Sequence, residues 1–275
     1  MNKPTRPVLR WHGGKWLLAP WIIDHMPEHR VYVEPFGGAA SVLMRKPRSY
    51  AEIYNDLDGD LVNLFEILRS DKGEKLVSNL ELTPFSETEF KSAYEATDDP
   101  MERARRLVIR SFMGFGSAGA SGQSTGFRAN SNRSGTTPAH DWCNYPDCLR
   151  LVIDRMRGVV VQSRPALEVI RQHDGPETLH YVDPPYMPET RDRGSDYRFE
   201  MTVDDHRELL EFLRGVEGRV ILSGYPTETY DQVLSGWRRV ARKALADGAR
   251  ERTEVLWMNF EPDAQQSLFD QAGVA

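Results

Sequence analysis

Short apolar runs alternate with helical periodicity over the first seventy residues. Residues 30–34 and 51–54 are apolar enough to form short buried strands. A helical stretch over residues 39–45 follows the first run after a Gly-Gly turn, and a second over 61–69 carries apolar residues at positions 61, 64, 65 and 68. Strand, turn, helix, strand and helix in this order predict the beginning of a parallel α/β sheet.

The same alternation returns in the second half of the chain. Apolar runs predict strands over residues 158–162, 178–182, 219–223 and 253–260. Helical stretches cover 203–214 and 227–234, and Thr202 with Asp205 three positions later resembles a capping box at the start of the first. Both halves therefore contribute to one α/β domain.

The middle of the chain has a different character. Residues 76–110 are helical and charged, and 101–113 form an amphipathic stretch. Residues 114–138 contain six glycines and five serines, which predicts a long flexible loop. We therefore expect residues 1–56 and 150–260 to form the α/β domain, 57–149 to be a mainly helical insertion that includes this loop, and 261–275 to be a polar tail.

Charge is unevenly distributed along the chain. The 275 residues have a formal net charge of −6, but residues 101–171 hold 11 arginines, no lysine and only five acidic residues. A local excess of arginine favours binding to a polyanion such as nucleic acid, even in an acidic chain. We expect Arg110, Arg128 and Arg133 of the insertion to contact DNA.

Composition also excludes several classes of protein. The chain has two cysteines, Cys143 and Cys148, without the companion Cys or His pair of a zinc site, so we expect free thiols and no metal. No segment approaches the ~20 apolar residues of a membrane span, and the N-terminus lacks the apolar run of a signal peptide. We expect a cytoplasmic protein with no membrane contact, and a monomer.

A glycine turn follows the first predicted strand. In the segment YVEPFGGAAS, Phe36, Gly37 and Gly38 lie between the strand and a helix, where glycine lets the backbone approach a ligand closely. Asp56 ends the next strand, and a carboxylate at that place can accept hydrogen bonds from both ribose hydroxyls of a nucleoside. Taken alone, Asp56 could equally be a helix cap.

A second motif, DPPY, follows the predicted strand 178–182. Open α/β sheets bind ligands at the carboxyl ends of their strands. The carboxylate of Asp183 and the carbonyl of Pro184 can both accept hydrogen bonds from one amino group, and Tyr186 offers a flat face for stacking. A third segment, RWHGGK, contains Trp11 and Lys15 near the N-terminus.

The ordered set RWHGGK, YVEPFGG, YND, DPPY and RTEVLWMN resembles the Dam-type, DPPY-containing family of adenine-specific DNA methyltransferases. The resemblance covers the chain from Arg10 to about Phe260. It implies a Rossmann-like, S-adenosylmethionine-dependent methyltransferase sheet with an inserted, mainly helical target-recognition region. It also implies that S-adenosylmethionine is held by Trp11, Lys15, Phe36, Gly37, Gly38, Asp56 and Asp183.

By this resemblance the protein is a site-specific enzyme that methylates the 6-amino group of adenine in double-stranded DNA after flipping the base, as in restriction-modification systems. Asp183, Pro184 and Tyr186 are the expected catalytic residues. Two alternatives stay open at this point. One is methylation of another amino group, in cytosine, RNA or protein glutamine, and the other is a non-enzymatic DNA-binding module with a vestigial cofactor site.

The tail carries one further motif. Gln265, Leu268 and Phe269 lie in the segment QQSLF, which resembles the short peptide that docks bacterial proteins on the replication sliding clamp. We expect double-stranded DNA as the substrate. The bacterial clamp is the second expected partner, and the alternative is that Leu268 and Phe269 fold back onto the protein's own surface.

Overall fold

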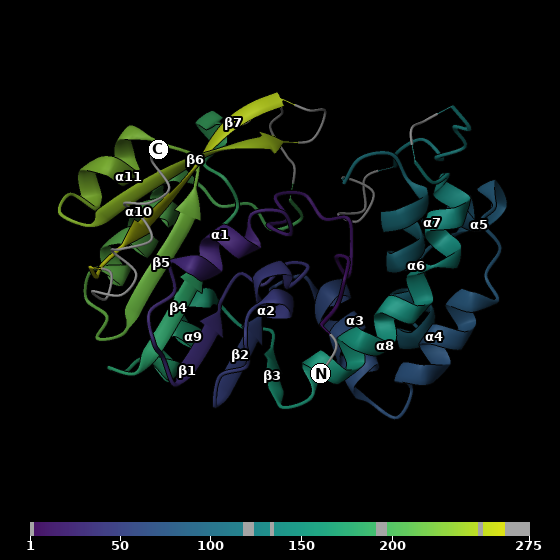
Figure 1. Ribbon diagram of the computed structural model, residues 1–275, viewed down its shortest axis with the longest axis horizontal. Helices are drawn as coiled ribbons and strands as arrows, with labels where there is room; N and C mark the ends of the chain where they lie inside the picture. Colours follow the sequence, from purple (N-terminus) through teal and green to yellow (C-terminus); the bar gives the residue numbers. More distant parts are fainter. Residues whose placement is uncertain (1–2, 118–123, 133–134, 191–196, 247–249, 262–275) are drawn as a thin grey trace.

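The computed structural model describes residues 3–117, 124–132, 135–190, 197–246 and 250–261. Its centre is a seven-stranded sheet of order β3-β2-β1-β4-β5-β7-β6 (Figure 1). The strands are β1 (Val31–Glu34), β2 (Ala51–Asn55), β3 (Val159–Gln162), β4 (Thr178–Val182), β5 (Arg219–Gly224), β6 (Arg238–Ala246) and β7 (Arg250–Met258).

The first five strands in this order are parallel, whereas β7 runs antiparallel to both β5 and β6. The predicted α/β class and the Rossmann-like sheet are therefore confirmed. The strand predicted over 253–260 is β7, shifted toward the N-terminus. Strand β6 was not predicted, because its segment RRVARKALA is basic and lies at the edge of the sheet, where no continuous apolar run is needed.

Helices cover both faces of the sheet. They are α1 (Ala19–Asp24), α2 (Ser41–Arg45), α3 (Gly59–Arg69), α9 (Ala166–His173), α10 (Val203–Leu213) and α11 (Glu228–Val233). Successive side chains of β1 point to opposite faces of the sheet. Tyr32 is buried with residues of α1, α2 and α3, and Val33 is buried against Val169 of α9. The capping box of α10 is confirmed, since Thr202 and Asp205 exchange both hydrogen bonds.

The remaining helices gather beside α3, away from the sheet (Figure 1). They are α4 (Gly73–Glu81), α5 (Glu87–Ser92), α6 (Pro100–Met113), α7 (Pro138–Cys143) and α8 (Tyr145–Met156). Helix α3 packs against α4, α6 and α8, so one apolar core continues from the sheet into this helical region. Helix α8 runs without a break through residues 149 and 150, where we expected the insertion to end.

Candidate functional site

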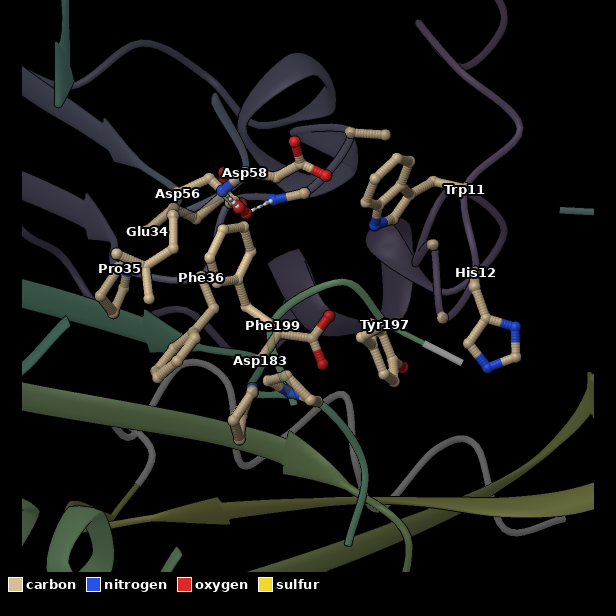
Figure 2. A pocket seen from close by; sticks show the side chains of 18 of the residues that line it. Trp11, His12, Glu34, Pro35, Phe36, Asp56, Asp58, Asp183, Tyr197 and Phe199 are labelled. Carbon is tan, nitrogen blue, oxygen red and sulfur yellow. Dashed lines mark hydrogen bonds between the residues drawn. The ribbon is translucent and has the colours of Figure 1, made fainter. Parts of the chain in front are cut away.

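A cleft of about 990 Å³, partly open to solvent, lies at the carboxyl ends of β1, β2 and β4 (Figure 2). Its lining brings together most of the residues singled out from the sequence: Trp11, Lys15, Phe36, Gly37, Gly38, Asp56, Asp183 and Pro184.

Close packing fixes the glycine turn after β1. A Cβ at Gly37 would lie 2.2 Å from Cε2 of Tyr54, whose ring is buried beneath the turn. The Tyr54 hydroxyl donates to the Gly38 carbonyl at 2.8 Å, and Gly38 itself has a φ of +49°, which favours glycine. The turn is thereby held as bare backbone facing the cleft.

Asp56 anchors the other side of this turn. Its Oδ2 accepts the backbone N–H of Gly38 at 2.8 Å, and its Oδ1 accepts that of Asp58 at 2.8 Å. Burial raises the pKa of Asp56 to about 6. The carboxylate therefore supports the turn and also lines the cleft, where its remaining lone-pair capacity is available to a ligand.

Asp183 has a divided environment. Its Oδ1 lies 2.8 Å from Nζ of Lys15 and accepts the hydroxyl hydrogen of Ser223 at 2.8 Å. Among the described residues no donor contacts its Oδ2. One oxygen is thus fixed by the protein, and the carboxylate borders the cleft with the other still able to accept a hydrogen bond.

Lys15 is the buried cation of the site. Its ammonium also donates to the Gly13 carbonyl at 3.0 Å and to the Tyr186 hydroxyl at 2.9 Å. Burial by itself lowers the pKa of Lys15, but the attraction of Asp183 and Glu254 outweighs it and raises that pKa well above its ordinary value. Lys15 is therefore a permanent positive charge next to Asp183.

Tyr186 lies outside the large cleft. Its ring stacks on Tyr225 with centroids 4.0 Å apart, and both rings line an adjoining cavity of about 530 Å³. The backbone of Gly13 packs close by, since a Cβ there would lie 3.4 Å from Cε2 of Tyr186. A base could stack on Tyr186 only after Tyr225 or the segment around Gly13 had moved.

The sequence reasoning missed Glu34 as a site residue. This carboxyl ends β1 and lines the cleft, and its Oε1 accepts hydrogen bonds from Tyr32 at 2.9 Å and from the backbone of Leu43 at 3.1 Å. Its Oε2 is buried and has no hydrogen-bond partner in the described part of the chain. Burial raises the pKa of Glu34 to about 8. An acidic residue at the end of a buried strand, just before a glycine turn, was the available signal.

Residues 197–201 were also missed. Tyr197 and Phe199 line the cleft, and Figure 2 shows Tyr197 on the same side as Trp11 and His12. Arg198 holds this segment to the start of α3, with Nη1 3.0 Å from Asp58 and 3.2 Å from Asp60. No sequence motif marked these residues.

The arginines expected to bind DNA have different surroundings. The Arg128 guanidinium is buried and donates to the Phe112 carbonyl at 2.9 Å. Arg110 donates to the Ala93 carbonyl at 2.7 Å and lies 3.5 Å from Asp60. These contacts give both side chains a structural role, so their contact with DNA stays a prediction that the geometry does not favour.

Some expectations fall on residues outside the described ranges. Arg133 and the clamp-like residues Gln265, Leu268 and Phe269 belong to this set. Within the described ranges, no group of three or more His, Cys, Asp or Glu side chains is arranged to hold a metal ion. No helix there has the length and apolar character that crossing a bilayer requires.

Comparison of the sequence with known proteins identifies the family to which the chain belongs. The profile of the D12 class N6 adenine-specific DNA methyltransferases matches residues 11–245. The DNA adenine methylase of Escherichia coli K12 is 24% identical over 279 residues, which cover 94% of this chain and 97% of that protein. The DNA adenine methylase of Salmonella typhi is 32% identical over 119 residues, or 41% of this chain and 42% of that protein.

Proposed function

Because the chain belongs to the D12 class N6 adenine-specific DNA methyltransferase family, it methylates adenine in DNA, and we propose that Asp183 and Pro184 hold the amino group that receives the methyl. The observation that carries this proposal is that the two carboxylate oxygens of Asp183 have different surroundings. Lys15 and Ser223 fix Oδ1, which leaves Oδ2 for the substrate.

The cleft residues fit S-adenosylmethionine. This cofactor, when bound, supplies a methyl group on a positively charged sulfur. The glycine turn at Gly37 and Gly38 offers bare backbone, and Asp56 offers lone pairs to ribose hydroxyls. Trp11, Phe36 and Phe199 add apolar and aromatic walls. The buried Oε2 of Glu34, which has no hydrogen-bond partner among the described residues, provides a further polar group in the cleft, a donor when the carboxyl is protonated and an acceptor when it is ionised.

The amino group of adenine is a weak nucleophile because its lone pair is delocalised into the ring. We assign Oδ2 of Asp183 and the carbonyl of Pro184 as the acceptors of its two hydrogens. Accepting them localises electron density on the nitrogen as it becomes tetrahedral. Fixed acceptors of this kind act mainly by positioning and by electrostatic stabilisation of the transition state.

The target base has to leave the duplex to reach Asp183, at a cost of a few kcal/mol. We assign stacking of the base to Tyr186, which requires the rearrangement near Gly13 or Tyr225 described above, and base–aromatic stacking returns ~1–3 kcal/mol.

The arginine-rich insertion is the proposed DNA-binding region, with Arg133 among its contacts. Docking of the tail on a sliding clamp, a cytoplasmic location and a monomeric state belong to the same proposal.

Methyl transfer from labelled cofactor to DNA tests the assignment of Asp183. The isosteric variant Asp183→Asn should lower kcat by a factor of about 10²–10³, the usual effect of removing one electrostatic partner of a transition state. Asp204→Asn is the matched control, since Asp204 is 91% exposed on α10. Full activity of Asp183→Asn would refute the assignment.

A further inference from the structure

A second buried carboxylate lies behind Asp183. Glu254 of β7 is 1% exposed, its Oε1 lies 3.4 Å from Nζ of Lys15, and its Oε2 accepts the Tyr186 hydroxyl hydrogen at 3.3 Å. It lines the smaller cavity and is absent from the lining of the large cleft. Lys15, which contacts both carboxylates, therefore links Glu254 to Asp183, in addition to the direct repulsion between the two carboxylates.

Two carboxylates thus share one ammonium in a buried place. When both are ionised, Lys15, Asp183 and Glu254 together carry one net negative charge, and when Glu254 is protonated they are neutral. An ionised Glu254 draws the ammonium away from Asp183. The charge on Asp183 is then less neutralised, which makes Oδ2 a stronger acceptor.

We infer that Glu254 is a positioning residue, which acts through Lys15 to set the strength of Asp183 as a hydrogen-bond acceptor. The inference rests on the proposed function, because it takes Asp183 as the acceptor of the amino group. A purely structural role for Glu254 would require only that its volume and its hydrogen bonds be kept.

The charge of Glu254 changes near neutral pH. Burial raises its pKa to about 7, and the attraction of Lys15 opposes that rise only in part. The other titratable or charged groups around it and its cavity are His12, Tyr181, Tyr225, Arg242 and Arg252. Of these, Arg242 lies opposite Glu254 in the β6–β7 register and is exposed.

The test is the pH dependence of kcat/KM for the cofactor with DNA saturating, between pH 5.5 and 9, in the full chain. Such a profile reports groups of the enzyme before the cofactor binds. We expect wild-type kcat/KM to rise with pH through neutrality. Glu254→Gln keeps the volume of the side chain but cannot ionise, so its profile should lose the part of the rise near pH 7 and fall about tenfold below wild type at high pH, while the titration of Asp56 and Glu34 in the cleft is common to both profiles. Glu251→Gln on the same strand is the control, since Glu251 is 73% exposed.

Three results would overturn the inference. The first is a Glu254→Gln profile with the wild-type shape, and the second is the same loss of the rise in Glu251→Gln. If Glu254→Gln does not fold, Glu254→Asp is used in its place. This variant keeps a carboxyl group, so it should be slower than wild type but keep the rise of kcat/KM with pH. A flat profile for Glu254→Asp would be the third refuting result. A wild-type chain without methyl transfer would instead contradict the proposed function.

Discussion

Substituting Gly37 by alanine tests how the cofactor turn is built. The new Cβ would lie 2.2 Å, 2.5 Å and 3.0 Å from three ring carbons of Tyr54, whereas carbon atoms in contact are normally ~3.5–4.0 Å apart. Tyr54 cannot move freely, because its ring is fully buried against Phe65 and its hydroxyl is bonded to the Gly38 carbonyl. Gly37 is therefore required by a close approach.

The expected cost combines two terms. Overpacking a core costs ~1–3 kcal/mol, and loss of the Tyr54 hydrogen bond costs about 1 kcal/mol. We expect Gly37→Ala to lower the free energy of unfolding by roughly 2–4 kcal/mol and to weaken cofactor binding at least about tenfold, because the turn must shift. Denaturant unfolding and calorimetric titration with S-adenosylmethionine measure the two effects.

A control and a rescue make the reasoning refutable. Gly215→Ala should change stability by less than about 0.5 kcal/mol, since its Cβ would meet only an ordinary contact at 3.6 Å. In the double variant Gly37→Ala/Tyr54→Leu the losses should be less than additive, because the smaller side chain removes the clash. Wild-type stability and affinity in Gly37→Ala would refute the account of the turn.

Three further predictions follow from the buried groups. Burial raises the pKa of Glu34 from 4.5 to about 8, so the folded state holds a proton that the unfolded state releases, and wild-type stability should fall as pH rises across that window. Glu34→Gln should lack this loss. Urea unfolding at pH 6 and pH 9 measures the free energy of unfolding of the wild type and the variant, and an equal pH dependence in the two would contradict the reasoning. Arg128→Ala should cost about 1–3 kcal/mol of stability because the Phe112 carbonyl loses its donor, which thermal melting measures. Asp56→Asn should raise KM for the cofactor about tenfold with little change in kcat, since the two backbone N–H groups bind different carboxylate oxygens and asparagine replaces one of these oxygens by an NH2 donor; an unchanged KM would count against it.

Local patterns predicted the parallel part of the fold well. The runs at 30–34, 51–54 and 178–182 are buried strands whose side chains contact helices on both faces, so they need continuous apolar sequence. Strand β6 has no such signature, because at the sheet edge only one neighbour and part of one face require apolar contact. Its pairing with β7 depends on the rest of the sheet.

The candidate site was predictable where a motif sits at the end of a strand. Asp56 and Asp183 meet in one cleft because parallel strands end at the same edge. The further partners of Lys15 and Asp183 were not predictable, since Glu254, which pairs with Lys15, and Ser223, which donates to Asp183, come from distant strands. Arg128 shows the converse: a positive charge in a glycine-rich loop suggested DNA contact, and only the folded chain reveals the buried carbonyl that it meets.

The most direct test of the central claim is the identity of the methylated product. Duplex DNA is incubated with the wild-type chain and methyl-labelled S-adenosylmethionine, digested to nucleosides and separated by chromatography with mass detection. We predict that the label elutes as N6-methyl-2′-deoxyadenosine and that Asp183→Ala yields none above background. Label on cytosine, or equal N6-methyladenine from the Asp183→Ala chain, would contradict the account.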